Sequence, residues 1–166
     1  MQKNQKDEQE RKQGHWEEPE TYSRDLSLKK GGKDTIKFEG LSTGNYKDDK
    51  RHGKWLLSSF NGEMVEEGWY EDDKKNGHWH KRLFSPRTPH YMLSRGTYKD
   101  DKKHGHWREE LELDLPASKG GKGLYVFEGE YVDDEKDDLW TVKRPDGTVV
   151  HQTWRNGKLI TSKKVK

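Results

Sequence analysis

Gly96-Thr-Tyr98-Lys-Asp-Asp-Lys-Lys-His-Gly105-His-Trp107 is one of four versions of a single phrase in this chain. The others span residues 44–55, 68–79 and 129–140, and in each a Tyr and a Trp stand nine residues apart. Repetition of this kind is typical of proteins built from stacked units, which usually serve as binding surfaces. The repeat therefore favours a non-catalytic function over an enzyme.

Composition predicts an ordered but thin protein. Hydrophobic residues make up 27% of the chain and charged residues 39%, which is too little apolar material for a thick two-layer core. Seven Trp, seven Tyr and four Phe are nearly all placed periodically. Because an aromatic side chain buries about 150–250 Å², a few of them can hold a single layer together. The chain has no Cys, which excludes disulfides and thiolate metal sites.

Charge and hydropathy limit the partner and the location. The net charge is +2 with both signs mixed along the chain. This argues against nucleic acid, because a nucleic-acid surface gathers Lys and Arg on one face. The first eight residues have no apolar core of the kind found in secretory signals, and no stretch approaches the ~18 apolar residues of a membrane span. A cytoplasmic location is the expectation.

Each phrase predicts a β-hairpin. Its centre combines Asp side chains, which hydrogen-bond their own backbone, with a Gly able to adopt positive φ. We expect Tyr98 to lie directly opposite Trp107 across the hairpin, with Asp100 opposite Gly105 and a four-residue tip. Such a cross-strand aromatic pair contributes about 0.2–1 kcal/mol. The glycines expected in these turns are Gly14, Gly53, Gly77 and Gly105.

A second kind of turn joins one phrase to the next. Asn61-Gly62 is a strong hairpin signal, and it places Trp55 opposite Gly68. Pro145-Asp146-Gly147 gives Trp140 the same register, in which a Trp lies over a small or flat neighbour. No segment of ten or more residues has helical periodicity. The sequence therefore predicts an all-β, single-layer antiparallel meander of stacked hairpins.

One repeat domain is predicted, with a short charged arm before it and a basic tail after it. Partial copies of the phrase flank the four full ones, as expected of a repeat protein that must cap its two ends. The first partial copy has Asp7 where Tyr belongs. The predicted segments are the arm 1–6, the domain 7–160 with partial copies at 7–16 and 152–158, and the tail 161–166.

From about residue 7 to 160 the chain resembles MORN repeats (membrane occupation and recognition nexus), whose unit has the form Tyr-x-Asn/Asp-Gly-Lys-x-x-Gly. In two places it departs from that pattern. Trp55, Trp79, Trp107 and Trp140 stand where the family has a later Gly, and Asp49, Asp73, Asp101 and Asp134 replace the first turn glycine. The Gly-x-Trp ending is more similar to the variant repeats of bacterial antitoxin- and immunity-type proteins. The resemblance implies a twisted single-layer sheet used for scaffolding, self-association or partner binding.

Alternation along the strands assigns the aromatic residues to one face of the sheet. We expect this face to form a groove for a segment of a partner protein; the alternative is that the rings pack on one another as the core. The opposite face is expected to be mixed polar, with Trp69, His80, Arg95 and Arg108 among its residues. The candidate binding residues are Tyr46, Trp55, Tyr70, Trp79, Tyr98, Trp107, Tyr131, Trp140 and Trp154.

Charged and histidine side chains at the hairpin tips suggest two further sites, and both have simpler explanations. The basic pairs Lys50-Arg51, Lys74-Lys75 and Lys102-Lys103 would suit anionic lipid, but each follows an acidic pair, so solvated turn charges are the preferred interpretation. His52 and His104 share a turn position with Asn76, which indicates turn chemistry rather than metal binding. We predict no metal, no cofactor and no catalytic residue, since no nucleophile or phosphate-loop motif is present.

The sequence thus predicts a non-catalytic protein-binding module, in its most concrete form an intracellular antitoxin- or immunity-type neutralising partner. The alternative is a structural scaffold that self-associates as a homo-oligomer, at membranes or in a larger assembly. An inhibitor should capture one protein tightly. A scaffold should form concentration-dependent oligomers, for which unsealed sheet edges are suited.

Overall fold

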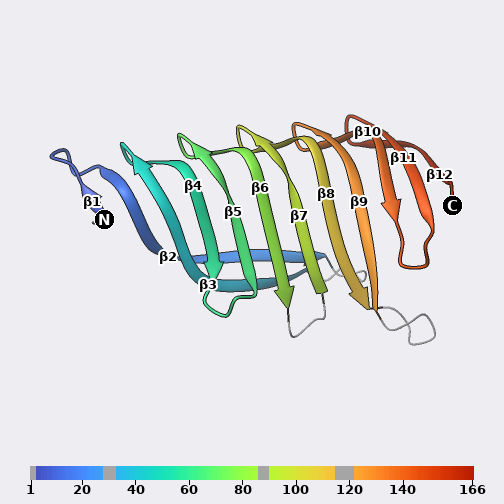
Figure 1. Ribbon diagram of the computed structural model, residues 1–166, viewed down its shortest axis with the longest axis horizontal. Coiled ribbons are helices and arrows are strands. Elements are labelled where there is room, and N and C mark those ends of the chain that lie inside the picture. The colour runs from blue at the N-terminus through green and yellow to red at the C-terminus, as the bar shows by residue number, and fades with distance from the viewer. Residues whose placement is uncertain (1–2, 28–32, 86–89, 115–121) are drawn as a thin grey trace.

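A computed structural model describes residues 3–27, 33–85, 90–114 and 122–166, which form one open antiparallel sheet with its twelve strands in sequence order (Figure 1). The predicted all-β meander is confirmed. The strands are β1 (Gln5–Lys6), β2 (Lys12–Ser27), β3 (Lys33–Lys47), β4 (Lys50–Ser59), β5 (Met64–Glu71), β6 (Lys74–Ser85), β7 (His90–Lys99), β8 (Lys102–Asp114), β9 (Lys122–Val132), β10 (Glu135–Lys143), β11 (Val149–Arg155) and β12 (Lys158–Lys164).

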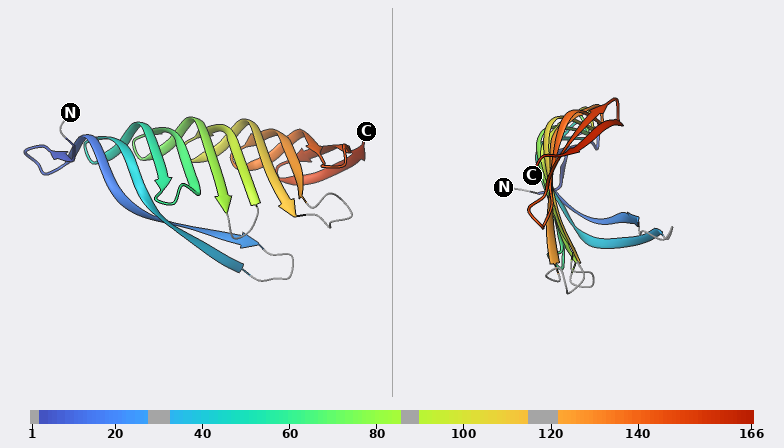
Figure 2. Two further views of the ribbon diagram at one scale, coloured as in Figure 1. Left: turned by 60° about the horizontal axis from the view of Figure 1, so that its bottom comes forward. Right: turned by 90° about the vertical axis from the view of Figure 1, so that its right-hand side faces the viewer.

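The sheet is curved, and it extends past the predicted domain at both ends. The strand ends that carry the Asp-Asp turns curl to one side, and the long hairpin of β2 and β3 leaves the sheet toward that same side (Figure 2). β1 lies within the predicted arm, and β12 continues through residues 161–164 of the predicted tail. Both terminal segments therefore belong to the sheet.

The hairpin tips are tighter than the sequence suggested. Tyr98 pairs with Lys103, not with Trp107, around a two-residue turn in which Asp100 and Asp101 both have positive φ. Turns of this kind match the twist of the flanking strands, which explains why they replace the expected four-residue tip. A bulge at Gly105, with φ +74, then shifts the register and brings Trp107 back beside Tyr98. The two rings meet as predicted, but through the bulge and not as a directly opposed pair.

The predicted register between phrases is confirmed, with Trp55 opposite Gly68. The ring of Trp55, however, covers Gly44 on the other neighbouring strand, and Gly68 lies beneath Trp79. A Cβ atom added to Gly68 would lie 2.1 Å from the Trp79 ring. At each of these positions, therefore, only glycine leaves room for the next tryptophan to lie flat against the sheet.

These contacts build one continuous aromatic ladder along the sheet. Adjacent rings alternate between Trp and Tyr and meet edge to face, with centroids 5.0 to 6.1 Å apart, an arrangement that aromatic pairs favour. Each buried indole also donates a hydrogen bond to the backbone; Trp107 Nε1 lies 3.0 Å from the carbonyl oxygen of Thr97. The aromatic ladder consists of Trp16, Tyr46, Trp55, Tyr70, Trp79, Tyr98, Trp107, Tyr131 and Trp140.

A second chain of contacts links the tips of successive hairpins. The backbone N–H of Asp101 donates to the carbonyl of Lys75, and the N–H of Lys75 donates to the Asp101 carboxylate at 2.8 Å. This Asp bridge recurs from one hairpin to the next. The other pairs are Asp49 with Lys12, Asp73 with Arg51, and Asp134 with Lys103.

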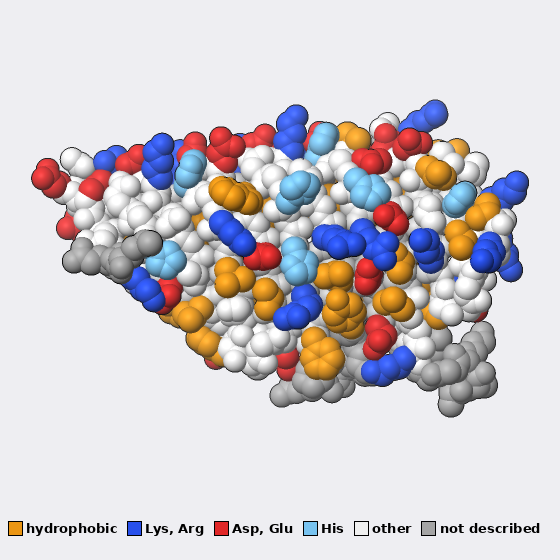
Figure 3. Space-filling view, viewed as in Figure 1, with side chains coloured by type: hydrophobic (Ala, Val, Ile, Leu, Met, Phe, Trp, Pro, Cys, Tyr) orange, Lys and Arg blue, Asp and Glu red, His pale blue; other side chains and the backbone are white. Residues whose placement is uncertain are grey.

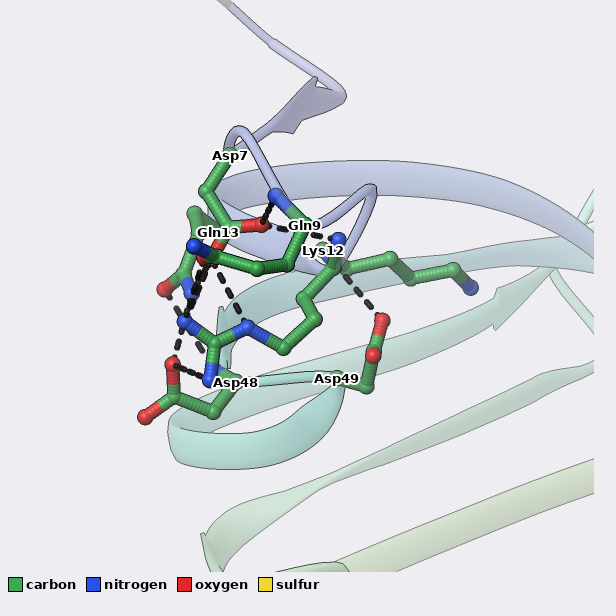
Figure 4. A network of polar contacts seen from close by, with 7 residues as sticks. Asp7, Gln9, Lys12, Gln13, Asp48 and Asp49 are labelled. Carbon is green, nitrogen blue, oxygen red and sulfur yellow. Dashed lines mark hydrogen bonds and ion pairs between the residues drawn. The ribbon is translucent and has the colours of Figure 1, made fainter.

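The first partial copy is held by polar contacts where the others use a tyrosine (Figure 4). The Asp7 carboxylate accepts hydrogen bonds from the backbone and guanidinium of Arg11 and from the Gln13 side chain. Partial desolvation opposes ionisation, but these donors prevail and lower the pKa of Asp7 to about 2. Arg11 and Gln13 also contact Asp48, which joins this cap to the first full hairpin.

Replacing Gly96 with Ala tests the contact between glycine and tryptophan. Its Cβ would lie 2.2 Å from the Trp107 ring, so we expect Gly96→Ala to destabilise the protein by about 3 kcal/mol. Gly105→Ala is the control, because it strains a positive φ but has no atom within 4 Å of the new Cβ, and it should cost only about 1 kcal/mol. Urea denaturation followed by tryptophan fluorescence measures both, and an equal loss in the two variants would contradict the prediction.

The Asp bridge is tested within a single turn. Asp100 and Asp101 have the same chemistry and both have positive φ, but only Asp101 accepts the hydrogen bond from the Lys75 backbone. Asp101→Ala should therefore lower the free energy of unfolding by about 1 kcal/mol more than Asp100→Ala does. If thermal denaturation ranks the two variants the other way, the bridge does not stabilise the stack.

Candidate functional site

The structure places most of the predicted binding residues in the core. Trp55, Trp79, Trp107 and Trp140 are between 0 and 3% exposed, and Tyr70 and Tyr131 are also buried. Tyr46, Tyr98 and Trp154 are half-buried. The four buried indoles are therefore packing residues in this structure, which agrees with the alternative that the sequence left open. That the aromatic face binds a partner stays a prediction.

A row of cations covers the aromatic ladder, and sequence reasoning missed it. Arg51, Lys75 and Lys103, taken as solvated turn charges, lie over aromatic rings, whereas the preceding Lys50, Lys74 and Lys102 are exposed. Their charges lie 4.0, 4.2 and 4.4 Å from the ring centroids of Tyr70, Trp79 and Trp107, within the range of cation–π attraction. The signal was present, because Lys12, Arg51, Lys75, Lys103 and Lys136 occupy one repeat position without exception.

Carboxylates lie beside this row, so the aromatic face is more polar than expected. Glu18 pairs with Lys12, Glu109 pairs with Lys103, and the buried Glu66 contacts both Lys75 and Lys81. Burial alone would raise the pKa of Glu66, but the two lysines outweigh it and hold the pKa below its ordinary value. These ion pairs close the surface over the rings.

Burial also keeps the ladder tyrosines neutral. It raises the pKa of Tyr70 to about 12, although Arg51, 2.9 Å from the phenol oxygen, acts in the opposite direction. Burial raises the pKa of Tyr98 and Tyr131 as well. The main cause of each shift is burial in the core.

The opposite face of the sheet carries an open groove of about 540 Å³, which we call the polar-face groove. Trp69 lies in it with 55% of its surface exposed, in contrast to the ladder tryptophans. His, Lys and Arg side chains gather across the middle of this face among scattered hydrophobic ones (Figure 3). The groove therefore combines an exposed indole with basic side chains.

A cross-strand row of charged residues runs through this groove. It begins at Glu67 on β5 and ends at Glu128 on β9, with basic residues on the three strands between. Glu67 contacts Lys54 at 3.1 Å, and Glu128 contacts His106 at 3.2 Å. Read in strand order, the row is Glu67, His80, Arg95, Arg108 and Glu128.

Within the described part of the chain, no group of three or more His, Cys, Asp or Glu side chains is placed to hold a metal ion. The same part contains no helix of the length and hydrophobicity that crossing a membrane requires.

The buried Glu66 gives the protein a pH-dependent contribution to stability. A carboxyl with a lowered pKa in the folded state stabilises above its unfolded pKa, and that stability is lost as the pH falls through the folded pKa. Glu66→Gln should therefore cost about 2 kcal/mol at pH 7, and the difference from wild type should shrink once the pH drops below the ordinary value of 4.5. Glu67→Gln, on the more exposed Lys54 pair, is the control and should cost less. A pH-independent difference in denaturation midpoint would refute this role for Glu66.

No protein-family model matches the chain, and comparison with curated proteins finds no significant match. The resemblance to MORN repeats therefore stays a prediction that rests on the residues quoted above. The meander of stacked hairpins is observed independently of it.

Proposed function

We propose that this protein is a non-catalytic protein-binding module that holds its partner across the polar-face groove. One observation carries the proposal: the exposed Trp69 lies beside basic side chains, on a sheet in which the other tryptophans of the four full phrases are buried. Trp and Arg are the residues most enriched among those that dominate protein–protein binding energy. The surface is open and shallow, which suits a protein segment better than an enclosed small molecule.

The antitoxin- or immunity-type role is the most concrete form of this proposal. Its support is the similarity of the Gly-x-Trp ending to the variant repeats of such proteins. A neutralising partner of this kind would form a single tight complex. The repeat sheet supplies a firm platform for it, because the aromatic ladder and the Asp bridges fix each hairpin to its neighbours.

A self-associating scaffold is the second candidate, and the edge strand β12 favours it. All seven residues of β12 are exposed, including Leu159 and Ile160. Unpaired edge strands are templates for further pairing, although the lysines at its end oppose contact between copies. Light scattering over a wide concentration range separates the candidates, since only the scaffold should grow with concentration.

Capture from a lysate of the source cells tests the binding module. Three baits are compared: wild type, Trp69→Ser, and Phe60→Ser as the control, since Phe60 is 68% exposed and does not line the groove. We expect wild type and Phe60→Ser to retain one stoichiometric partner and Trp69→Ser to weaken it by about 2 kcal/mol or more, the loss typical of a dominant interface residue. The affinity for the recovered partner is then measured by calorimetry. If the Trp69→Ser bait retains the partner as well as wild type does, the polar-face groove is not the binding site.

A further inference from the structure

Arg95 is the centre of the charged row in the polar-face groove. Its directly opposed neighbours are His80 on β6 and Arg108 on β8. Like charges placed opposite each other in an antiparallel sheet destabilise the pair. Among the residues that the structure describes, no carboxylate or hydrogen-bond partner is assigned to the Arg95 side chain, which is exposed. The sheet therefore carries a positive charge here that its own acids do not neutralise.

The neighbouring acids already contact other basic side chains. Arg108 contacts Glu110 at 2.8 Å and Glu128 at 3.4 Å. At the other end of the row, Glu67 is shared by Lys54 and His80. If one of these carboxylates turned to neutralise Arg95, one of the existing pairs would break. An external carboxylate would leave them intact.

Apolar surface lies in the same groove. Trp69 follows Glu67 by two residues along β5, and its register partner on β4 is Lys54. Its exposed indole offers apolar contact area in the groove that Arg95 also lines. A ligand that satisfies both would carry a carboxylate and an apolar side chain on one extended segment.

We infer that the polar-face groove binds an acidic segment of a protein, with a carboxylate on Arg95 and an apolar side chain against Trp69. The inference rests on the proposed function and gives its partner a chemical class. Nucleic acid fits less well. The basic part of the row spans three adjacent strands, about 10 Å, and Glu67 and Glu128 lie at its two ends. A phosphate backbone needs a longer basic stripe and would meet these carboxylates.

A fluorescein-labelled peptide, Glu-Leu-Glu-Glu-Leu-Glu, serves as the probe, and its binding to the full chain is followed by fluorescence anisotropy at low ionic strength. Arg95→Glu should weaken binding about fivefold or more, because it replaces an attraction by a repulsion. Lys143→Glu is the matched control, since it makes the same charge change at an exposed residue on the same face outside the groove, and it should change binding less than about twofold. If circular dichroism shows that Arg95→Glu misfolds, Arg95→Gln takes its place. The affinity of Arg95→Gln for the peptide should lie between those of wild type and Arg95→Glu.

Three results would overturn the inference: no binding of the peptide to wild type, equal binding to Arg95→Glu, or tighter Arg95-dependent binding of an oligothymidylate of equal charge. The proposed function fails separately. If the captured partner depends on Trp69 but not on Arg95, the binding module stands and the acidic segment is wrong. If no stoichiometric partner is captured, the binding module itself is wrong.

Discussion

The close approach of each tryptophan to a glycine on the adjacent strand is the constraint on which the rest of the structure depends. With no Cβ at Gly44, Gly68, Gly96 and Gly129, four indoles lie flat against the backbone and become almost fully buried in a single-layer sheet. The tyrosines then fill the spaces between indoles, and the cations close the surface above. A chain with few hydrophobic residues thereby obtains a core without a second layer of structure.

The polar residues of the repeat complete that core. Lys75 illustrates this, because its backbone bonds Asp101, its ammonium group lies over Trp79, and the same group pairs with Glu66. One lysine thus connects the tip of the next hairpin, the aromatic ladder and a buried carboxylate. The charge that composition alone would associate with a solvated surface is largely part of the packing on this face.

Much of the fold could be predicted from the sequence, and the errors in that prediction have physical causes. Asn61-Gly62 fixed the pairing of Trp55 with Gly68, because a short turn leaves little freedom of register. The predicted register of the hairpin tip at Asp100 and Asp101 was wrong. A tight turn followed by a bulge gives Tyr and Trp the same spacing in the sequence as a longer loop does, so the spacing could not distinguish the two. The cation row was missed for the same reason. The expected four-residue tip left Lys103 in the turn, whereas the observed register pairs it with Tyr98 and so places it on the aromatic face. The basic row in the groove was assigned to the correct face, but ion pairing is set by side-chain geometry that spacing does not encode.

The Asp bridges that the structure describes link consecutive hairpins, as in repeat proteins whose stability is nearly one-dimensional. In such a stack, each hairpin is stabilised mainly by its two neighbours, so cooperativity passes from one unit to the next. A whole hairpin inserted with its glycine, tryptophan and turn aspartate would meet the same contacts on both sides. Gain or loss of complete units is therefore the change of length that such a chain tolerates best. The span of its surface can grow or shrink in steps while every contact between units is kept.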